Sequence, residues 1–427
     1  MNNFSVLEKQ VKELKLKIRK DRLKYDELFK VGIEVEGCLL DDKAVPVNAA
    51  DLIEELSGSS FFERTGCMID YEYGSCQFEF KTPPLTFRNL SKINELYEEF
   101  IIENLNIALG KVFKNRNVIP VFLGANPSPY VLNDSIVTNN ERYIKLFKWQ
   151  STFSDIEFEG KRIRPSHVAA AIQGFHFHLQ SRNPVHAVQM FNHILNLIPS
   201  SILLGASSKL FAGTIFSYHE PRIYLYDRSE QQDSGFPAIP RYLDNMEDYI
   251  EYIKSRKPDT ATDYFQLEKE RHDDIRIRLN SEFYRVETRI ISVQPTPKSL
   301  MAMIEFFIGY LYHVISGKSS IKDLLRPLST IREERVFSIQ NGFGGKSHIN
   351  LKDSLTIQLD YAKKGLSELG IRPEFIYILE KRLDNKMAPS VYVGNLWNKY
   401  FNGHIDQTIS EIILEVWQRT KNNNPIF

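Results

Sequence analysis

The 427-residue sequence has little cysteine and no pattern that would put cysteine to structural use. Its three cysteines, Cys38, Cys67 and Cys76, show no C-x-x-C spacing, which excludes a cysteine-rich zinc cage and a dense disulfide framework. The chain also opens without the features of a signal peptide. We therefore expect a reduced compartment, the cytoplasm.

The sequence also lacks an excess of positive or of negative charge. The 54 Lys and Arg residues balance 54 Asp and Glu residues, so the whole-chain field favours neither nucleic acid nor an anionic membrane as a partner. An anionic ligand must then be held by a local group of cations. The longest apolar stretch, 301–315, is shorter than the roughly 18 residues that a spanning helix requires, and it predicts a buried helix.

The sequence does contain a mixture of strand and helix patterns, which predicts an α+β fold. Strand patterns cover 30–40, 74–82, 117–125, 171–180 and 283–292, and helical patterns cover 88–113, 186–210, 245–256 and 298–317. An amphipathic helix is expected before residue 29, and mainly helices, with a closing one near 405–420, after residue 318. The polar stretch 227–240 reads as a long loop, and such loops often act as lids.

Acids and histidines recur two residues apart in the apolar strands. "VGIEVEGCL" carries Glu34 and Glu36, and "AAIQGFHFHLQ" carries His176 and His178. Side chains at this spacing share one face of a strand. One such pair alone is typical of a solvated strand or of packed histidines. Their repetition within hydrophobic surroundings instead indicates a common polar face.

Two further segments add to this pattern. "VETRIISVQPT" places Glu287 and Arg289 two apart, where an exposed ion pair would have little energetic consequence. Glu72 and Glu79 are an odd number of residues apart, so a regular strand would put them on opposite faces. One of them must lie outside the strand, through a bulge or a turn at Gly74.

Burying several unneutralised carboxylates is costly, so a bound cation is expected on this face. An oxygen-rich set with an occasional imidazole suits Mg²⁺ or Mn²⁺ better than Zn²⁺. These ions commonly hold nucleotide phosphates. Arg289, and Arg276 in "HDDIRIRL", would then face a phosphoryl group.

The ordered motifs "GIEVEG", "EYGSCQFEFKTP", "NNERYIKLF", "QGFHFHL", "LLGASSKLFAGTIFSYHEPRIY" and "RVETRIISVQPT" resemble the type 2 glutamate-cysteine ligase family, or carboxylate-amine ligases, over residues 28–350. The resemblance implies a glutamine synthetase-like catalytic sheet, curved and mainly antiparallel, with a glutamate-lined concave face that carries Mg²⁺ (or Mn²⁺) and ATP. It also implies that a small-molecule carboxylate, typically the γ-carboxylate of glutamate, is activated as an acyl phosphate. An amine then attacks to give an amide, ADP and phosphate.

The resemblance assigns roles to individual residues. Metal ligands are implied at Glu34, Glu36, Glu72, Glu79, Glu287 and either His176 or His178. Cations near the transferred phosphoryl group are implied at Arg289, Arg276 and Arg222, and contacts to the nucleotide at Glu34, Glu79, Arg276 and Arg289. It further implies a homo-oligomer and a division into an N-terminal helix (1–28), a catalytic domain (29–330) and a mainly helical C-terminal part of the same domain (331–427).

Two departures from the family pattern concern the substrate pockets. Ser292 stands where members commonly have the Asp of E-x-R-x-x-D, and "AGTIFSYHEPR" replaces a Gly-x-Asp-Thr-Gly segment. The glutamate and cysteine specificity of the family therefore does not transfer with the metal face.

Two alternatives remain open. A non-haem iron enzyme could use His176, His178 and Glu287 as its ligands, which would leave Glu34 and Glu36 without a role. A catalytically inactive relative could act as a binding module through its helical C-terminal third.

Overall fold

The computed structural model describes residues 3–20, 30–229, 234–255, 263–279, 284–316, 324–344 and 349–427. An eight-stranded sheet lies at its centre, with the order β13-β14-β8-β1-β3-β2, and β4 and β5 also pair with β1. Every pairing in this sheet is antiparallel, which confirms the predicted α+β class with a mainly antiparallel sheet. The strands are β1 (Lys30–Asp41), β2 (Met68–Tyr71), β3 (Gln77–Lys81), β4 (Leu85–Thr86), β5 (Val118–Val121), β8 (Gly174–Gln180), β13 (Ile275–Arg278) and β14 (Arg285–Ser292).

Strand β1 shows why the sheet has two unlike faces. Val31, Ile33 and Val35 are fully buried, while Glu34 and Glu36 between them are half-buried on the opposite face. This alternation follows from the two-residue period of a strand. One face of the sheet is thus apolar and packed, and the other carries carboxylates.

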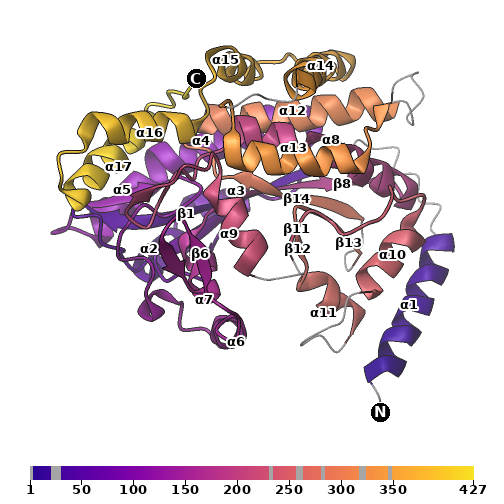
Figure 1. Cartoon of the computed structure of the whole chain (residues 1–427), viewed down its shortest axis with the longest axis horizontal. Helices are drawn as coiled ribbons and strands as arrows, with labels where there is room; N and C mark the ends of the chain where they lie inside the picture. Colours follow the sequence, from indigo (N-terminus) through magenta and orange to yellow (C-terminus); the bar gives the residue numbers. More distant parts are fainter. Residues whose placement is uncertain are drawn as a thin grey trace.

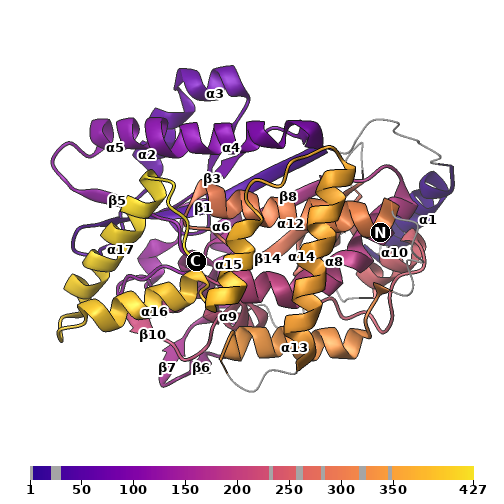
Figure 2. The same cartoon turned by 90° about the horizontal axis from the view of Figure 1, so that it is seen from above.

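Helices cover the apolar face, as seen above the sheet in Figure 1 and from above in Figure 2. The helices α8 (Pro184–Gly205) and α12 (Pro297–Ser316) are long and apolar enough to span a membrane by length and composition. However, 94% and 78% of their apolar windows are buried inside the structure, so both are core helices. Outside them lie α13 (Leu328–Asn341), α14 (Ile349–Glu368) and α15 (Tyr377–Asn385), while α16 (Pro389–Tyr400) and α17 (Ile405–Lys421) lie towards β5.

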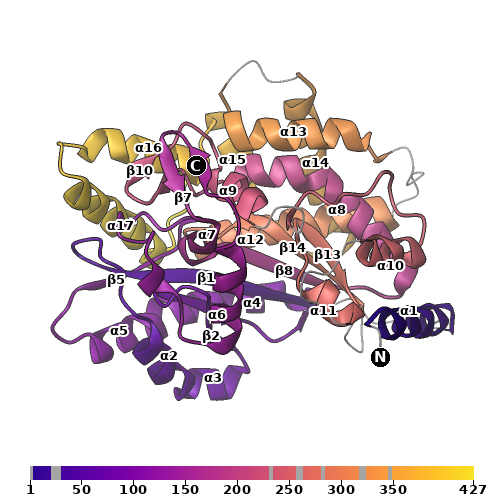
Figure 3. The ribbon, with the colours of Figure 1, turned by 60° about the horizontal axis from the view of Figure 1, so that its bottom comes forward.

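The remaining elements complete the cover of the apolar face, where Tyr97 and Phe100 pack on Phe80 of β3, and surround the sheet edges and the polar face (Figure 3). The predicted helix 88–113 is an almost continuous run of η1 (Phe87–Asn89), α4 (Leu90–Glu99), the π-helical turn η2 (Phe100–Leu105) and α5 (Asn106–Val112). Near the polar face lie α6 (Glu141–Gln150), α7 (Pro165–Ala171), α9 (Pro221–Ser229) and α11 (Tyr264–Lys269). The other short elements are α2 (Ala50–Ser57), α3 (Ser60–Thr65), η3 (Asp134–Ile136), β6 (Ile156–Phe158), β7 (Lys161–Ile163), β9 (Leu210–Phe211), β10 (Thr214–Ile215), β11 (Ser234–Gly235) and β12 (His272–Asp273).

The N-terminal helix α1 (Asn3–Lys20) packs on α10 (Met246–Lys254) and α11, as its amphipathic pattern predicted. Lys15 pairs with Glu251 at 2.5 Å, and Arg19 pairs with Glu247 at 2.7 Å. Both pairs are substantially exposed, so they orient the helix more than they stabilise it. Residues 21–29, the rest of the predicted segment, lie outside the described residues.

The prediction of one long loop over 227–240 is wrong. Helix α9 continues to Ser229, and residues 234–235 form β11, which pairs with β12. Tyr224 and Tyr226 pack against the core and extend the apolar side of α9. The polar residues that follow them in the sequence favoured a loop instead. The predicted lid falls partly on 230–233, which lie outside the described residues.

Arg382 on α15 ties the C-terminal helices to the rest of the fold. Its side chain is fully buried and donates to the carbonyls of Leu204 and Ile426 (2.9 Å each), to Gln294 Oε1 (2.9 Å) and to Ser299 Oγ (3.0 Å). No other side chain could satisfy all four acceptors, because only guanidinium has so many donors in fixed directions.

We expect Arg382→Ala to lower the free energy of unfolding by about 3 kcal/mol, since it leaves several buried acceptors without donors. Chemical denaturation measures this loss. Arg372→Ala is the control, because Arg372 is exposed in the same region and should change the free energy by less than about 0.5 kcal/mol. Equal effects of the two substitutions would contradict the assignment.

Candidate active site

Strand register brings the predicted acids and histidines together across the polar face. Glu34 lies opposite His176 in β8, and Glu36 lies opposite Glu79 in β3. His178 in turn lies opposite Glu287 in β14. Residues directly opposite in antiparallel strands have their side chains about 5 Å apart. Segments up to about 250 residues apart in sequence therefore contribute to one polar face.

The spacing of Glu72 and Glu79 is resolved by a hairpin. Glu72 follows the last residue of β2, and a turn over 73–76 leads into β3, which carries Glu79. The prediction that one of the two lies outside a regular strand is confirmed, and that residue is Glu72. The turn requires Gly74, because a Cβ there would lie 2.9 Å from the carbonyl oxygen of Ala170 and 2.7 Å from Gln77 Oε1.

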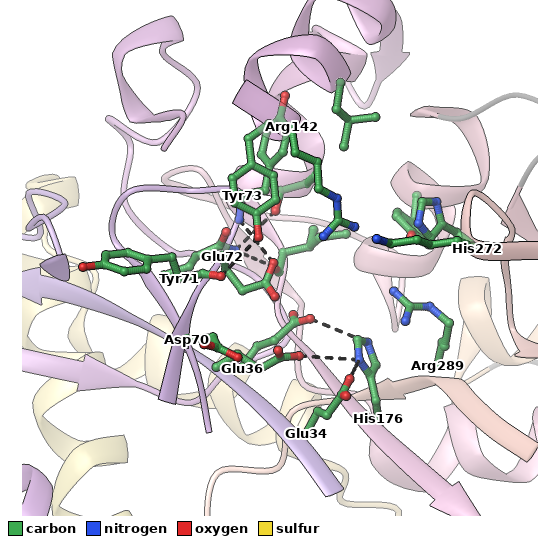
Figure 4. Close-up of a pocket in the computed structure, with 18 of the residues that line it drawn as sticks. Glu34, Glu36, Asp70, Tyr71, Glu72, Tyr73, Arg142, His176, His272 and Arg289 are labelled. Atoms are coloured by element: carbon green, nitrogen blue, oxygen red, sulfur yellow. Dashed lines mark hydrogen bonds and ion pairs between the residues drawn. The ribbon is translucent and has the colours of Figure 1, made fainter. Parts of the chain in front are cut away.

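A cavity of about 480 Å³ opens over this face. Lys81 lies among the acids and pairs with Glu79 and Asp70 at 2.7 Å each, whereas in Figure 4 Arg142, His272 and Arg289 lie across the cavity from the glutamates. The lining acids are Glu34, Glu36, Asp70, Glu72 and Glu79, and the lining cations are Lys81, Arg142, Arg222, Lys269, Arg276, Arg278 and Arg289. Such a division suits a ligand that carries both metal ions and anionic groups.

Two groups of side chains have the composition and spacing of metal ligands. In each of them, one ligand atom from every residue lies within 4.8 Å of the others: Glu34, Glu79 and His176 form one group, and Glu36, Glu72 and Glu79 form the other. Glu79 belongs to both. Carboxylate oxygens with one imidazole nitrogen match the preferences of Mg²⁺ and Mn²⁺, so these residues fit the predicted ion.

Histidine 176 is the centre of the first group. Its Nδ1 lies 3.1 Å from Glu34 Oε2 and 3.8 Å from Glu79 Oε1, and its Nε2 lies 3.6 Å from Glu36 Oε1 (Figure 4). Burial and the charge of Arg289 lower the pKa of His176 to about 3. The ring is therefore neutral near pH 7, the form that binds a metal.

The crowded carboxylates are electrostatically unsatisfied without a cation. Burial and the charge of Glu79 raise the pKa of Glu36 to about 7, and burial and the charge of Glu36 do the same for Glu72. Burial, with the charges of Glu72 and Glu34, raises the pKa of Glu79 well above its usual range. Burial also opposes ionisation of Glu34, but its two histidine neighbours hold its pKa well below the usual value. Such perturbation is typical of functional sites.

Glu36 is positioned by the backbone of β8. The N–H of Gly174 donates to Glu36 Oε2 at 2.5 Å. A Cβ at Gly174 would lie 2.6 Å from Arg222 Nη2. Glycine at this position therefore lets a carboxylate and a guanidinium both approach the start of the strand.

Glu287, a predicted metal ligand, is placed among arginines. Arg276 donates to both of its carboxylate oxygens at 2.9 Å, and Arg289 Nη1 donates to Oε1 at 2.7 Å. Burial opposes ionisation of Glu287, yet the two guanidinium groups hold its pKa well below the usual range. Neither metal-ligand group of described residues includes Glu287 or His178, although His178 Nε2 is 3.3 Å from Glu34 Oε1. The metal role of these two residues stays a prediction.

A β-bulge explains how Arg289 reaches the cavity. The pairing of β14 with β8 shifts register between Thr288 and Ile291, so Arg289 and Ile290 lie outside the regular ladder. Bulges commonly re-aim a side chain next to an active site. The carbonyls of Arg289 and Ile290 accept from the Arg222 guanidinium at 3.2 and 3.3 Å.

Sequence reasoning missed the residues that line the far side of the cavity. Arg142 and Tyr143 come from α6, Lys269 from the end of α11, and His272 from β12. The pKa of Lys269 is lowered, mainly by the charge of Arg142. Burial has the next largest effect, followed by the charges of Arg278 and Arg276. The motif "NNERYIKLF" contains most of α6, but nothing in its spacing shows that α6 lies over the sheet.

Comparison with known proteins places this architecture. The chain belongs to glutamate-cysteine ligase family 2 (GCS2), whose model matches residues 30–359. By family it is thus a glutamate-cysteine ligase-like protein. This confirms the resemblance identified from the motifs. No curated protein matches the chain in sequence.

Two solved structures share the fold. A glutamate–cysteine ligase from Francisella tularensis in complex with AMP has a TM-score of 0.59 at 15% identity, and the match covers 93% of this chain and 90% of that one. A bifunctional glutathione synthetase from Pasteurella multocida has a TM-score of 0.60 at 13% identity, over 92% of this chain. The chain spans about half the length of the latter, 52%.

Proposed function

We propose that the protein is an ATP-dependent ligase that joins a small-molecule carboxylate to an amine, forming an amide and releasing ADP and phosphate. The observation that carries the proposal is the cavity in which two overlapping groups of metal-ligand type face a wall of arginines. ATP and a carboxylate substrate are both anions, so bringing them together requires positive charge on all sides. Membership of the ligase family agrees with this chemistry.

Mg²⁺, or Mn²⁺, fits the two acidic groups. Glu34, Glu79 and His176 would hold one ion, and Glu36, Glu72 and Glu79 a second. A bound divalent ion neutralises phosphate charge and orients the triphosphate. The protein contributes the fixed positions of the five side chains, because each is set by a strand or by the β2–β3 turn.

In the proposed reaction the substrate carboxylate attacks the γ-phosphorus of ATP, the bond to the β–γ bridging oxygen breaks, and ADP leaves. The resulting acyl phosphate is attacked by the amine, which loses a proton and displaces phosphate. The γ-carboxylate of glutamate is the proposed donor, on the basis of the family. Arg289 and Arg276 are proposed to face the phosphoryl group, since both line the cavity beside the acids.

The chain's own residues supply positioning rather than a nucleophile. Arg276 and Arg289 share the carboxylate of Glu287, which holds both guanidinium groups in place. Arg222 is proposed to help through its contacts with the β14 bulge. Holding reactants in a fixed geometry supplies much of the rate acceleration in such enzymes.

The non-haem iron alternative is less well supported. It needs His176, His178 and Glu287 in one ligand set, but the Glu287 carboxylate is taken up by two arginines. It also leaves Glu36 and Glu72 without a role, although they converge with Glu79. If the protein were a catalytically inactive relative, the acidic groups would have persisted without a function. Measuring metal and nucleotide binding tests this alternative, because an inactive binding module should bind neither.

The partners belong to the same proposal: a small carboxylate, a small amine, and no nucleic acid or membrane. A homo-oligomer is proposed from the family resemblance, and a cytoplasmic location from the cysteine pattern. Phosphate release from ATP, measured against amino acids singly and in pairs, identifies the substrates, and mass spectrometry identifies the amide. A pair that releases phosphate only jointly names both substrates.

We expect ATP turnover to require Mg²⁺ or Mn²⁺ and to fall to background in the presence of EDTA, because the single charge of Lys81, which pairs with Glu79 at 2.7 Å, cannot balance the four carboxylates of the two acidic groups. Phosphate release before and after restoring Mg²⁺ measures this dependence. Activity that instead required Fe²⁺ and oxygen would support the iron enzyme and contradict the ligase.

A further inference from the structure

Arg335 joins the C-terminal helices to the cavity wall. It lies on α13 with 4% of its surface exposed, outside the residues that line the cavity. Its Nε and Nη2 donate to Asp274 at 2.6 and 2.9 Å, and its Nη1 and Nη2 donate to Asp227 at 2.7 and 2.9 Å. One guanidinium thus holds two carboxylates, each bidentately, a geometry that lysine cannot reproduce.

The two aspartates come from elements beside the cavity. Asp227 lies on α9, next to the cavity residue Tyr226. Asp274 lies between β12 and β13, two residues from Arg276. Its backbone N–H donates to the carbonyl of Gly235 in β11 at 2.8 Å. Arg335 therefore fixes the junction of α9, β11 and β13 from the rear.

This junction is bonded directly to Arg289. The N–H of Arg289 donates to the carbonyl of Asp274 at 2.8 Å, just beyond the last regular pair of β13 and β14, Ile275 with Thr288. On the other side of the same residue, its carbonyl accepts from Arg222 at 3.2 Å. Arg289 and Ile290 are outside the regular pairing of β14 with β8. The hydrogen bonds to Asp274 and Arg222 therefore determine the position of the Arg289 backbone.

We propose that Arg335 is a positioning residue, which acts through Asp274 to hold the β14 bulge and so aims the Arg289 guanidinium into the cavity. The inference rests on the proposed ligase function for its kinetic consequence. A residue of the helical C-terminal part of the chain would thus help to position a side chain of the sheet that faces the substrate. A displacement of about 1 Å at a catalytic group can cost on the order of 10²-fold in rate.

Arg335→Lys tests the proposal. Lysine keeps the charge but cannot hold both aspartates bidentately. We expect kcat to fall by about 10- to 100-fold while the KM for ATP changes less than about threefold, because binding groups stay in place while Arg289 loses its aim. Asp227→Asn, a milder change at a partly exposed partner, should lower kcat in the same direction if Arg335→Lys folds poorly.

The matched control is Arg382→Lys, which also alters a fully buried arginine of the C-terminal helices but one with no carboxylate partner among the described residues. It should lower the thermal midpoint and leave kcat per folded molecule unchanged. A kcat loss in Arg382→Lys equal to that in Arg335→Lys would overturn the proposal. So would a normal kcat in folded Arg335→Lys.

A double-mutant cycle identifies the route of the effect. If Arg335 acts through Arg289, the double variant Arg335→Lys with Arg289→Lys should be no slower than Arg289→Lys alone. Fully multiplicative losses would show independent roles and contradict the proposal.

A crystal structure of Arg335→Lys separates this inference from the proposed function. If none of the tested substrate pairs supports ATP turnover by the wild-type protein, the ligase assignment fails. The inference is then decided by the position of Arg289. Its Nη1 should leave Glu287 Oε1, now 2.7 Å away. An unmoved Arg289 side chain would overturn the inference whether or not the protein is a ligase.

Discussion

Replacing Glu79 by glutamine should lower ATP turnover by on the order of 10³-fold or more, because this carboxylate is shared by both groups of metal-ligand type. Glutamine keeps the shape of the side chain but removes its negative charge. Glu79 is 4% exposed and pairs with Lys81 at 2.7 Å. Because glutamine has the same size as glutamate, the substitution leaves no cavity. Two ions would each lose one charged ligand through a single change.

Metal binding provides a readout that does not depend on activity. A ligand that binds only the folded state raises the thermal midpoint in proportion to the logarithm of its concentration. Mn²⁺ should raise the midpoint of the wild-type protein and raise that of Glu79→Gln much less. Glu305→Gln is the matched control: Glu305 is also buried, but it accepts backbone N–H bonds from Phe375 and Ile376 on the far side of the sheet. A Glu79→Gln protein with a normal Mn²⁺ response would show that Glu79 is not a ligand.

Local alternation was enough to predict most of the sheet. The predicted strand at 30–40 is β1, 171–180 contains β8, and 283–292 contains β14. Strands β1 and β8 have apolar residues at alternate positions, Val31, Ile33 and Val35 in one and Phe175, Phe177 and Leu179 in the other, which the packed face of the sheet requires, and β14 departs from this at Thr288. The helices α8 and α12 were equally visible, because a helix that is apolar all around must be buried.

The acidic groups were also predictable in composition, though not in geometry. Spacing alone could place Glu34 with Glu36, and His176 with His178, each pair on one face of its own strand. Which strands lie side by side could not be read from the sequence, since β1 pairs with both β3 and β8, and β14 pairs with β8 across more than a hundred residues. The position of Glu72 depended on a turn whose form is set by tertiary contacts with Ala170.

The cation wall was the least predictable part. Arg142 and Lys269 lie on short amphipathic helices, where exposed cations are ordinary. Arg335 stands in "IREERVF", which reads as a solvated charged face, and its two aspartate partners lie 108 and 61 residues away. Nothing in a charge pattern distinguishes a buried triad from a surface one.

Replacing Arg289 by lysine should lower kcat by on the order of 10³-fold while changing the KM for ATP much less. In the structure one arm of the guanidinium, Nη1, is bonded to Glu287, while the side chain lines the cavity. The group thus retains donors for a ligand while it stays anchored. Lysine, with a single nitrogen, cannot reproduce this planar two-sided arrangement.

If Arg289 only neutralises Glu287, the same substitution should cost stability and leave turnover per folded molecule almost unchanged. Thermal midpoint and kcat measured on one preparation therefore distinguish the two roles. Arg285→Lys serves as the control, because Arg285 lies on the same strand but is absent from the described lining of the cavity. A side-by-side glutamate and arginine in a strand then has a chemical reason: the acid anchors the base, and the bulge at Arg289 and Ile290 turns the base toward the anion that it is proposed to meet.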